Sequence, residues 1–336
     1  MPMINPFNSN AFNMMALTSA INILPNLYGL TDQLGILPPK PTRLRTVAFE
    51  EYMGILQLLP TMPTGSPGSV GKRGKRTVRT FSIPHIPHDD VVRPEEVQGL
   101  RAFGTEDEMA AVSDIMALHL QTMRNKHAIT LENLRMGALK GIILDADGSV
   151  IYNLYDEFDI SQFSVRFRFS DPTFDVLEAC LSIRRHIEFS LMGEVMSSVL
   201  VLVSPEFYSA FIKHHSVLEA WKFYQNGVNL SADNRKGFSF GGLTWQEYIG
   251  QASDGEGSTV RFIAEGEGHA FPLGTASTFC TYFAPADFNE AVNTLGLPLY
   301  AKVLPSKFDR GLELHTQSNP LPMCHRPALL VHLTME

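Results

Sequence analysis

Cysteine is scarce in this sequence, with only three in 336 residues. Cys180, Cys280 and Cys324 lie far apart and form neither a CxxC pair nor a metal-ligand spacing. An odd number of isolated cysteines excludes a disulfide framework and indicates a reducing compartment. We therefore expect the chain to fold in the cytoplasm of a cell.

Charged residues are also few, at 18% of the chain, against a typical share of about 25%. A low share of charge is typical of a protein that hides much of its surface in contacts. The net charge is −8, which excludes the usual basic type of nucleic-acid binder, whose affinity comes from counterion release. This surface is not expected to grip DNA.

Long apolar runs are missing as well. The strongest run, residues 199–203, has the length of a buried strand and falls far short of the roughly 20 residues that cross a bilayer. The opening stretch is interrupted by Asn and Pro and has no basic region followed by an apolar one, unlike a signal peptide. We expect no contact with a membrane.

Motifs that carry catalysis are absent too. The sequence shows no nucleophile elbow and no phosphate-binding loop, and the glycine-rich stretch at 264–269 predicts turns. The most metal-like segment is HIPHDD, which contains His85 and His88. Its proline keeps the backbone extended, so the two imidazoles should point to different faces. We expect no catalytic residue, no cofactor and no metal.

Residues 1–45 combine frequent Asn and Pro with large apolar side chains that must be buried somewhere. These side chains are Phe7, Phe12, Met14, Met15, Leu17, Ile21 and Ile23. Two placements are open: an extended arm across another copy of the chain, or an arm packed on its own domain.

The next segment predicts a long basic loop. Residues 45–59 indicate two strands that turn at Met53-Gly54 as a hairpin, and a tip rich in Gly, Pro and Ser follows at 65–74, typical of a mobile loop. Five positive charges stand at or after this tip: Lys72, Arg73, Lys75, Arg76 and Arg79. They indicate either a solvated loop or docking onto an acidic surface of a neighbouring copy.

Residues 104–136 predict the clearest helix. Thr105 and Glu108 form a capping box, and apolar residues recur every three or four positions from Met109 through His127, which indicates one long buried face. A 30-residue helix spans roughly 45 Å, the length of a structural strut.

The remaining chain alternates strand and helix signals. Asp147-Gly148 predicts a hairpin turn, and residues 174–192 predict a helix capped by Asp171-Pro172. Residues 206–226 predict another helix, and the stretch RPALLVHLTM predicts a closing apolar strand. These signals together indicate a mixed domain of helices and strands.

This order of segments resembles the lambda-type major capsid protein family, often called phage capsid protein E. The stretches that carry the resemblance are IPHIPHDDVVRPEEVQGLRAFG, HLQTMRNKHAITLENLRMGALKGIILDADGSVIYNLYDEF and KFDRGLELHTQSNPLPMCHRPALLV. The resemblance covers nearly the whole chain and is specific when the three stretches are taken together.

The resemblance implies an α+β fold of the HK97-like type. Its parts would be an N-terminal arm at 1–45, an E-loop at 46–95, a P-domain at 96–155 with the long helix as its spine, an A-domain at 156–300 and a return to the P-domain at 301–336. Candidate contacts between subunits are then Phe7, Phe12, Lys72, Arg73, Lys75, Arg76 and Arg79.

The function implied by the resemblance is that of the major capsid protein of a tailed bacteriophage. Copies would assemble in the host cytoplasm into hexamers and pentamers of an icosahedral head that encloses double-stranded DNA, and the chain would end in the virion. The implied partners are other copies, a separate scaffolding protein, a portal and a decoration protein, with DNA bound without sequence specificity.

A hypothesis of another class is a soluble α/β enzyme or ligand-binding protein with a pocket in residues 174–300. The sequence weighs against it, because no acid, base or phosphate-binding motif converges there.

Overall fold

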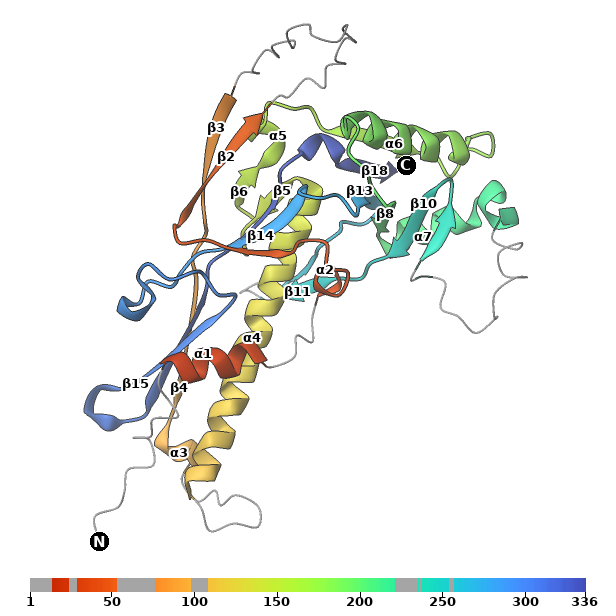
Figure 1. Cartoon of the computed structure of the whole chain (residues 1–336). Helices are drawn as coiled ribbons and strands as arrows, with labels where there is room; N and C mark the ends of the chain where they lie inside the picture. Colours follow the sequence, from red (N-terminus) through yellow and green to blue (C-terminus); the bar gives the residue numbers. More distant parts are fainter. Residues whose placement is uncertain are drawn as a thin grey trace, which may run out of the picture.

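The structure, a computed structural model, describes residues 14–23, 29–52, 76–97, 108–220, 235, 237–253 and 257–336. A long helix, α4 (Glu108–Lys140, 33 residues), runs through the molecule from a three-stranded sheet at one end to a six-stranded sheet at the other (Figure 1). At 1.5 Å per residue it is about 50 Å long.

The helix predicted at 104–136 is confirmed from residue 108 onward and ends four residues later than predicted, while residues 104–107 lie outside the described part of the chain. Its predicted apolar face is buried where the structure describes side chains, at Met116, Leu120 and Met123. The helix ends at Gly141, whose φ of 84° is left-handed and therefore suits glycine. The capping box at Thr105 lies outside the described residues.

The first sheet packs along the N-terminal half of α4. It contains β15 (Tyr300–Pro305), β16 (Leu312–Ser318) and β4 (Ile86–Val92) in that order, all antiparallel. The short helix α3 (Pro94–Val97) follows β4 and approaches the start of α4. Met116 and Met123 of α4 form a core cluster with side chains of β4 and β16.

The helix α1 (Met14–Ile23) packs on α4 and β15 of its own chain. Leu17 and Ile21 are buried in a cluster that includes Leu120 and Leu299. The Asn22 amide donates to the Leu299 carbonyl at 2.8 Å. Of the two placements left open for the first 45 residues, packing on the same chain is thus the one seen for 14–23, while residues 1–13 lie outside the described part.

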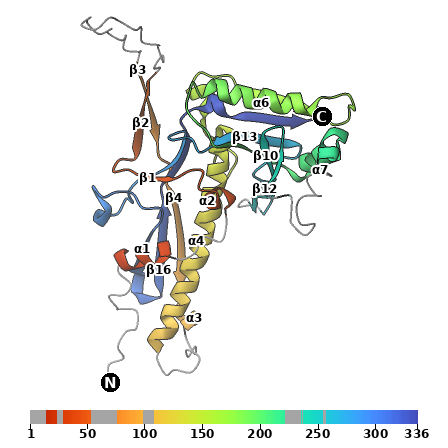
Figure 2. The same ribbon diagram turned by 45° about the vertical axis from the view of Figure 1, so that its right-hand side comes forward.

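The six-stranded sheet is mixed, in the order β7-β18-β13-β8-β10-β9. Its strands are β7 (Phe163–Phe167), β8 (Ser198–Val203), β9 (Phe238–Phe240), β10 (Leu243–Glu247), β13 (Glu267–Leu273) and β18 (Val331–Met335). One face packs on α6 (Val176–Ser190) and α7 (Pro205–Lys213), and α6 covers that face in both views (Figure 1, Figure 2). The other face meets the C-terminal part of α4.

Alternation along β8 shows why its apolar run is continuous. Val199, Val201 and Val203 join the core under α6 and α7, whereas Leu200 and Leu202 join the core that contains the end of α4. A strand buried on both faces has no polar positions. Residues 331–335, which the resemblance assigned to a return to the P-domain, form β18 in this sheet.

The remaining elements are small. The strands are β1 (Pro39–Pro41), β2 (Thr46–Tyr52), β3 (Arg76–Ser82), β5 (Ile142–Leu144), β6 (Val150–Asn153), β11 (Gln251–Ser253), β12 (Thr259–Arg261), β14 (Phe279–Phe283) and β17 (Pro320–Cys324). The helices are α2 (Leu30–Gln33), α5 (Leu154–Glu157) and the 3₁₀ turns Asn289–Ala291, Lys307–Asp309 and Pro327–Leu329. The sheet β1-β14-β17 adds to the core beside α4.

Some local predictions are confirmed and others are wrong. The hairpin at Asp147-Gly148 is present as β5–β6. The cap of α6 is Asp175, which accepts from the Leu177 and Glu178 amides, because Asp171 is used in a turn with Thr173. The helix predicted at 206–226 breaks at His214, where the backbone is extended.

The hairpin predicted at Met53-Gly54 has its turn and its second strand outside the described residues. Within the described residues β2 pairs with β3, in a register from Thr46 with Ser82 to Tyr52 with Arg76.

Candidate assembly surfaces

The two-stranded ribbon of β2 and β3 projects from the body of the molecule in both views (Figure 1, Figure 2). Its root is fixed by aromatic packing: the Phe49 ring lies 5.3 Å from Phe81, 5.5 Å from Tyr282 and 4.8 Å from His325. Phe81 is 1% exposed. The ribbon is anchored at this root, and its other end points away from the body of the molecule.

The predicted contact residues fall into two groups. Arg79 lies in β3, donates to the Glu157 carbonyl and stacks over the Phe158 ring, 5.3 Å from its centroid. It therefore packs on its own chain. Arg76 begins β3 at the end where the ribbon leaves the described residues. Outside the described residues lie Phe7, Phe12, Lys72, Arg73 and Lys75, whose contacts stay a prediction.

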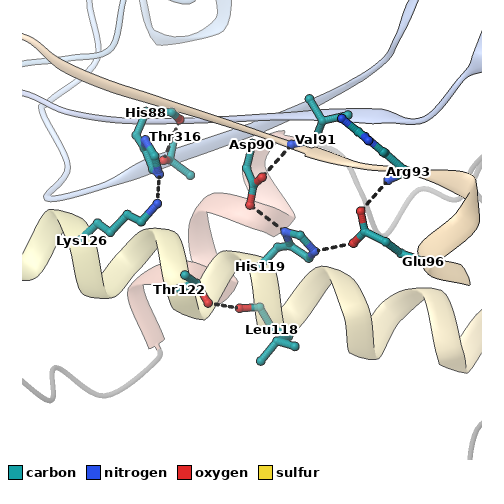
Figure 3. A network of polar contacts seen from close by, with 10 residues as sticks. All are labelled: His88, Asp90, Val91, Arg93, Glu96, Leu118, His119, Thr122, Lys126 and Thr316. Atoms are coloured by element: carbon teal, nitrogen blue, oxygen red, sulfur yellow. Dashed lines mark hydrogen bonds and ion pairs between the residues drawn. The ribbon is translucent and has the colours of Figure 1, made fainter. Parts of the chain in front are cut away.

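A polar network joins α4 to β4 and α3 (Figure 3). His119 of α4 places Nδ1 2.6 Å from Asp90 Oδ2 and Nε2 3.0 Å from Glu96 Oε2. Both nitrogens can donate only when the ring is protonated. Burial lowers the pKa of His119, but the two carboxylates outweigh it and the net pKa is raised. The two carboxylates thus favour the protonated form of His119, which can donate to both.

About two turns further along α4, the polar side chains that face β4 and β16 are a lysine and a histidine, with no carboxylate among the contacts described below. The Lys126 ammonium lies 3.1 Å from His88 Nε2, and the Thr316 hydroxyl donates to the His88 carbonyl at 3.1 Å (Figure 3). His127 Nε2 is 3.0 Å from the same Thr316 hydroxyl. Burial, with smaller effects of His88 and His315, lowers the pKa of His127 to about 4. This imidazole is neutral near pH 7.

The segment HIPHDD does not gather its polar side chains at one point. His85 Nδ1 lies 2.8 Å from the Asn319 amide oxygen. His88 and Asp90 turn to α4, while Asp89 pairs with His315 of β16. The segment thus connects β4 to α4 and to β16. The sequence singled out these polar residues but did not predict which side chains they contact.

Large apolar side chains are exposed at two ends of the molecule. Phe189, Met192 and Val195, at the end of α6 and in the loop after it, are 83%, 71% and 80% exposed. Phe308 and Leu304, at the tip of the β15–β16 hairpin, are 88% and 56% exposed. Clustered exposed side chains of this size are typical of surfaces that another protein covers.

Two hollows lie on the surface. One, of about 620 Å³, is bounded by α4, the β5–β6 hairpin and the β11–β12 pair. The other, of about 360 Å³, lies beside β7 and the start of α6 and includes Arg166, Asp171 and Glu178. The first lies largely outside residues 174–300, where the enzyme hypothesis places its pocket.

In the part of the chain that the structure describes, no helix combines the length and the apolar character that crossing a bilayer requires.

Solved structures share this architecture at low sequence identity. A prophage capsid protein of E. coli CFT073 is 14% identical, covers 96% of this chain and 99% of its own, and has a TM-score of 0.60. The subunit of the mature capsid of bacteriophage PhiM1 is 13% identical, covers 90% and 86%, and has a TM-score of 0.53. The fold is the HK97-like capsid fold.

Sequence relatives define the family. Residues 13–335 match the sequence family described as phage major capsid protein E. The major capsid protein of Pseudomonas phage KPP10 is 32% identical over 97% of both chains, and that of Salmonella phage Felix O1 is 29% identical over 98% of both. The chain belongs to the phage major capsid protein E family, and its function is that of a phage major capsid protein. It is a structural component of the virion that assembles from copies of itself.

Proposed function

We propose that this chain forms the hexamers and pentamers of an icosahedral head that encloses double-stranded DNA. The observation that carries the proposal is the family match over residues 13–335 in a subunit that exposes apolar side chains at separate ends. A closed shell buries such ends against neighbouring copies. The net charge of −8 suits an inner surface that does not hold packaged DNA tightly.

We propose the same division of the chain as the resemblance implies, with one refinement. The arm is 1–45, the E-loop 46–95, the P-domain 96–155 and the A-domain 156–300. Within 301–336, β15 and β16 support assignment to the P-domain because they pack on α4. In contrast, β18 supports assignment to the A-domain because it pairs with β7 and β13.

The basic segment next to β3 is proposed to dock on an acidic surface of a neighbouring subunit. Arg73, Lys75 and Arg76 are cations in an acidic chain, beside a ribbon that projects from the body. Charge complementarity between copies would guide their encounter and fix their register. Phe7 and Phe12 are proposed as apolar contacts of the arm.

The partners proposed beyond other copies are a separate scaffolding protein, a portal and a decoration protein, with assembly in the host cytoplasm. The match to a capsid family supports a structural role over the enzyme hypothesis.

The test is assembly of the purified full-length chain, followed by size-exclusion chromatography and negative-stain electron microscopy, with and without a co-expressed scaffolding protein. Closed shells, or discrete hexamers and pentamers, are expected. A chain that stays monomeric in every condition contradicts the proposal.

A triple variant separates the loop's role from the fold. Replacing Arg73, Lys75 and Arg76 by Gln should reduce the shell yield and leave the thermal unfolding of the subunit unchanged. The matched control exchanges Arg and Lys at the same positions, which keeps the charge. Normal shells from the Gln variant would remove the docking role.

A further inference from the structure

Three side chains that can bind a metal ion converge on the face of the six-stranded sheet opposite α6. Glu267 and His269 are two residues apart on β13 and therefore share a face. His332 of β18 lies directly opposite His269 in the strand register. The pairing of β13 with β18 thus brings together residues that are far apart in the sequence.

The potential ligand atoms of the three residues all lie within 4.8 Å of one another. Glu267 Oε2 is 3.5 Å from His332 Nε2 and 3.9 Å from His269 Nε2. The two imidazole rings are nearly parallel, at 17°, with centroids 5.1 Å apart. In a tetrahedral zinc site with bonds of about 2.0–2.1 Å, ligand atoms are roughly 3.3 Å apart. Small side-chain rotations would close the remaining distance.

His269 Nε2 points into this cluster without a hydrogen-bond partner, although the residue is only 4% exposed. A buried polar atom with no partner is costly, about 1–3 kcal/mol in general, and such atoms are rare in folded proteins. An unprotonated imidazole nitrogen offers a lone pair to a metal ion.

We propose that Glu267, His269 and His332 form a binding site for a divalent transition-metal ion, with zinc as the best match. Two imidazoles and one carboxylate are a ligand set that zinc takes with water in the fourth position. Glu267 and His332 are partly exposed, at 34% and 19% of their side chains, so the ion and the water can enter. The site does not rest on the proposed shell architecture.

Lys140 is a cation that interacts electrostatically with Glu267 and His269. Its positive charge would repel a metal ion bound at the cluster. Its ammonium donates to the Phe262 carbonyl at 2.9 Å. Burial lowers the pKa of Lys140, against the opposing effect of Glu267. The metal would bind at the three ligands while Lys140 keeps its carbonyl partner, with an affinity reduced by the nearby charge.

A metal at this position would tie β18 to β13 and stabilise the folded subunit by binding only to it. The test uses the full-length chain, freed of metal with EDTA and titrated with cobalt(II), whose visible absorption reports four-coordinate geometry. One cobalt per chain is expected. Zinc should raise the melting temperature by about 3 °C or more at a large excess over the dissociation constant.

Two variants and a matched control decide the assignment. His332→Ala and Glu267→Gln alter partly exposed ligands and should weaken cobalt binding at least about ten-fold, with loss of the zinc-dependent shift. His215→Ala removes an exposed imidazole elsewhere on the chain and should leave both signals unchanged. The inference is overturned if the wild type shows no cobalt absorption, or if the wild type and both ligand variants respond equally to zinc.

Discussion

The buried imidazole of His127 makes the stability of the subunit sensitive to acid. Its pKa is about 4 in the folded chain, and about 6.5 in an unfolded chain. Below pH 6.5 the unfolded state binds a proton that the folded state does not bind, so stability falls as the pH falls toward 4. Between pH 7 and pH 4.5 the loss attributable to this residue is about 2 kcal/mol.

The assay is urea unfolding of the isolated subunit at pH 7 and at pH 4.5, for the wild type and for His127→Gln. Glutamine does not titrate, suits a helix and can keep a hydrogen bond to the Thr316 hydroxyl. The variant should lose about 2 kcal/mol less than the wild type over this pH interval. His88 and His315 face the same imidazole and are present in both proteins, so the two proteins differ only at residue 127. His215→Gln, an exposed control, should behave as the wild type, and equal pH dependence in wild type and His127→Gln would refute the reasoning.

Three other substitutions test separate parts of the fold. His119→Gln should destabilise the subunit more at pH 5.5 than at pH 8. The raised pKa of His119 gives stability that is fully present below about pH 6.5 and is lost as the pH rises through the pKa of the folded state. Urea unfolding at both pH values measures this difference. Ile21→Ala should cost about 2–4 kcal/mol in urea unfolding, since Ile21 is fully buried between α1 and α4, and an unchanged midpoint would show that α1 does not stabilise the subunit. Gly141→Ala should lower stability by more than about 2 kcal/mol, because φ is +84° and the added Cβ would lie 2.5 Å from the Tyr155 ring; a calorimetric melting temperature equal to that of the wild type would contradict this.

The sequence predicts the elements whose signals are local. The spacing of Met116, Leu120 and Met123 identifies α4 and its buried face, and Asp147-Gly148 identifies the β5–β6 turn. These signals depend only on residues within a few turns of one another. The C-terminal end of α4 lies one turn beyond the predicted end because the stopping point depends on Gly141 and its close approach to Tyr155.

The pairing of distant strands could not be predicted in the same way. The partner of β2 lies beyond residues 53–75, and no pattern within 46–52 specifies it. For the metal-binding cluster, the spacing of Glu267 and His269 is visible in the sequence, but His332 joins them only through the pairing of β13 with β18. The sequence predicts no metal site because local motifs are absent, and the proposed site, which is built across two strands, has no local motif.

The position of β18 sets the order in which the six-stranded sheet can form during synthesis. β18 lies between β7 and β13, yet a ribosome makes it after every other strand of that sheet. β7 therefore leaves the ribosome with its backbone groups exposed and gains its pairing partner only when residues 331–335 emerge. The six-stranded sheet of a nascent chain stays incomplete until that moment, which delays a mature subunit surface until nearly the whole described sequence has been translated.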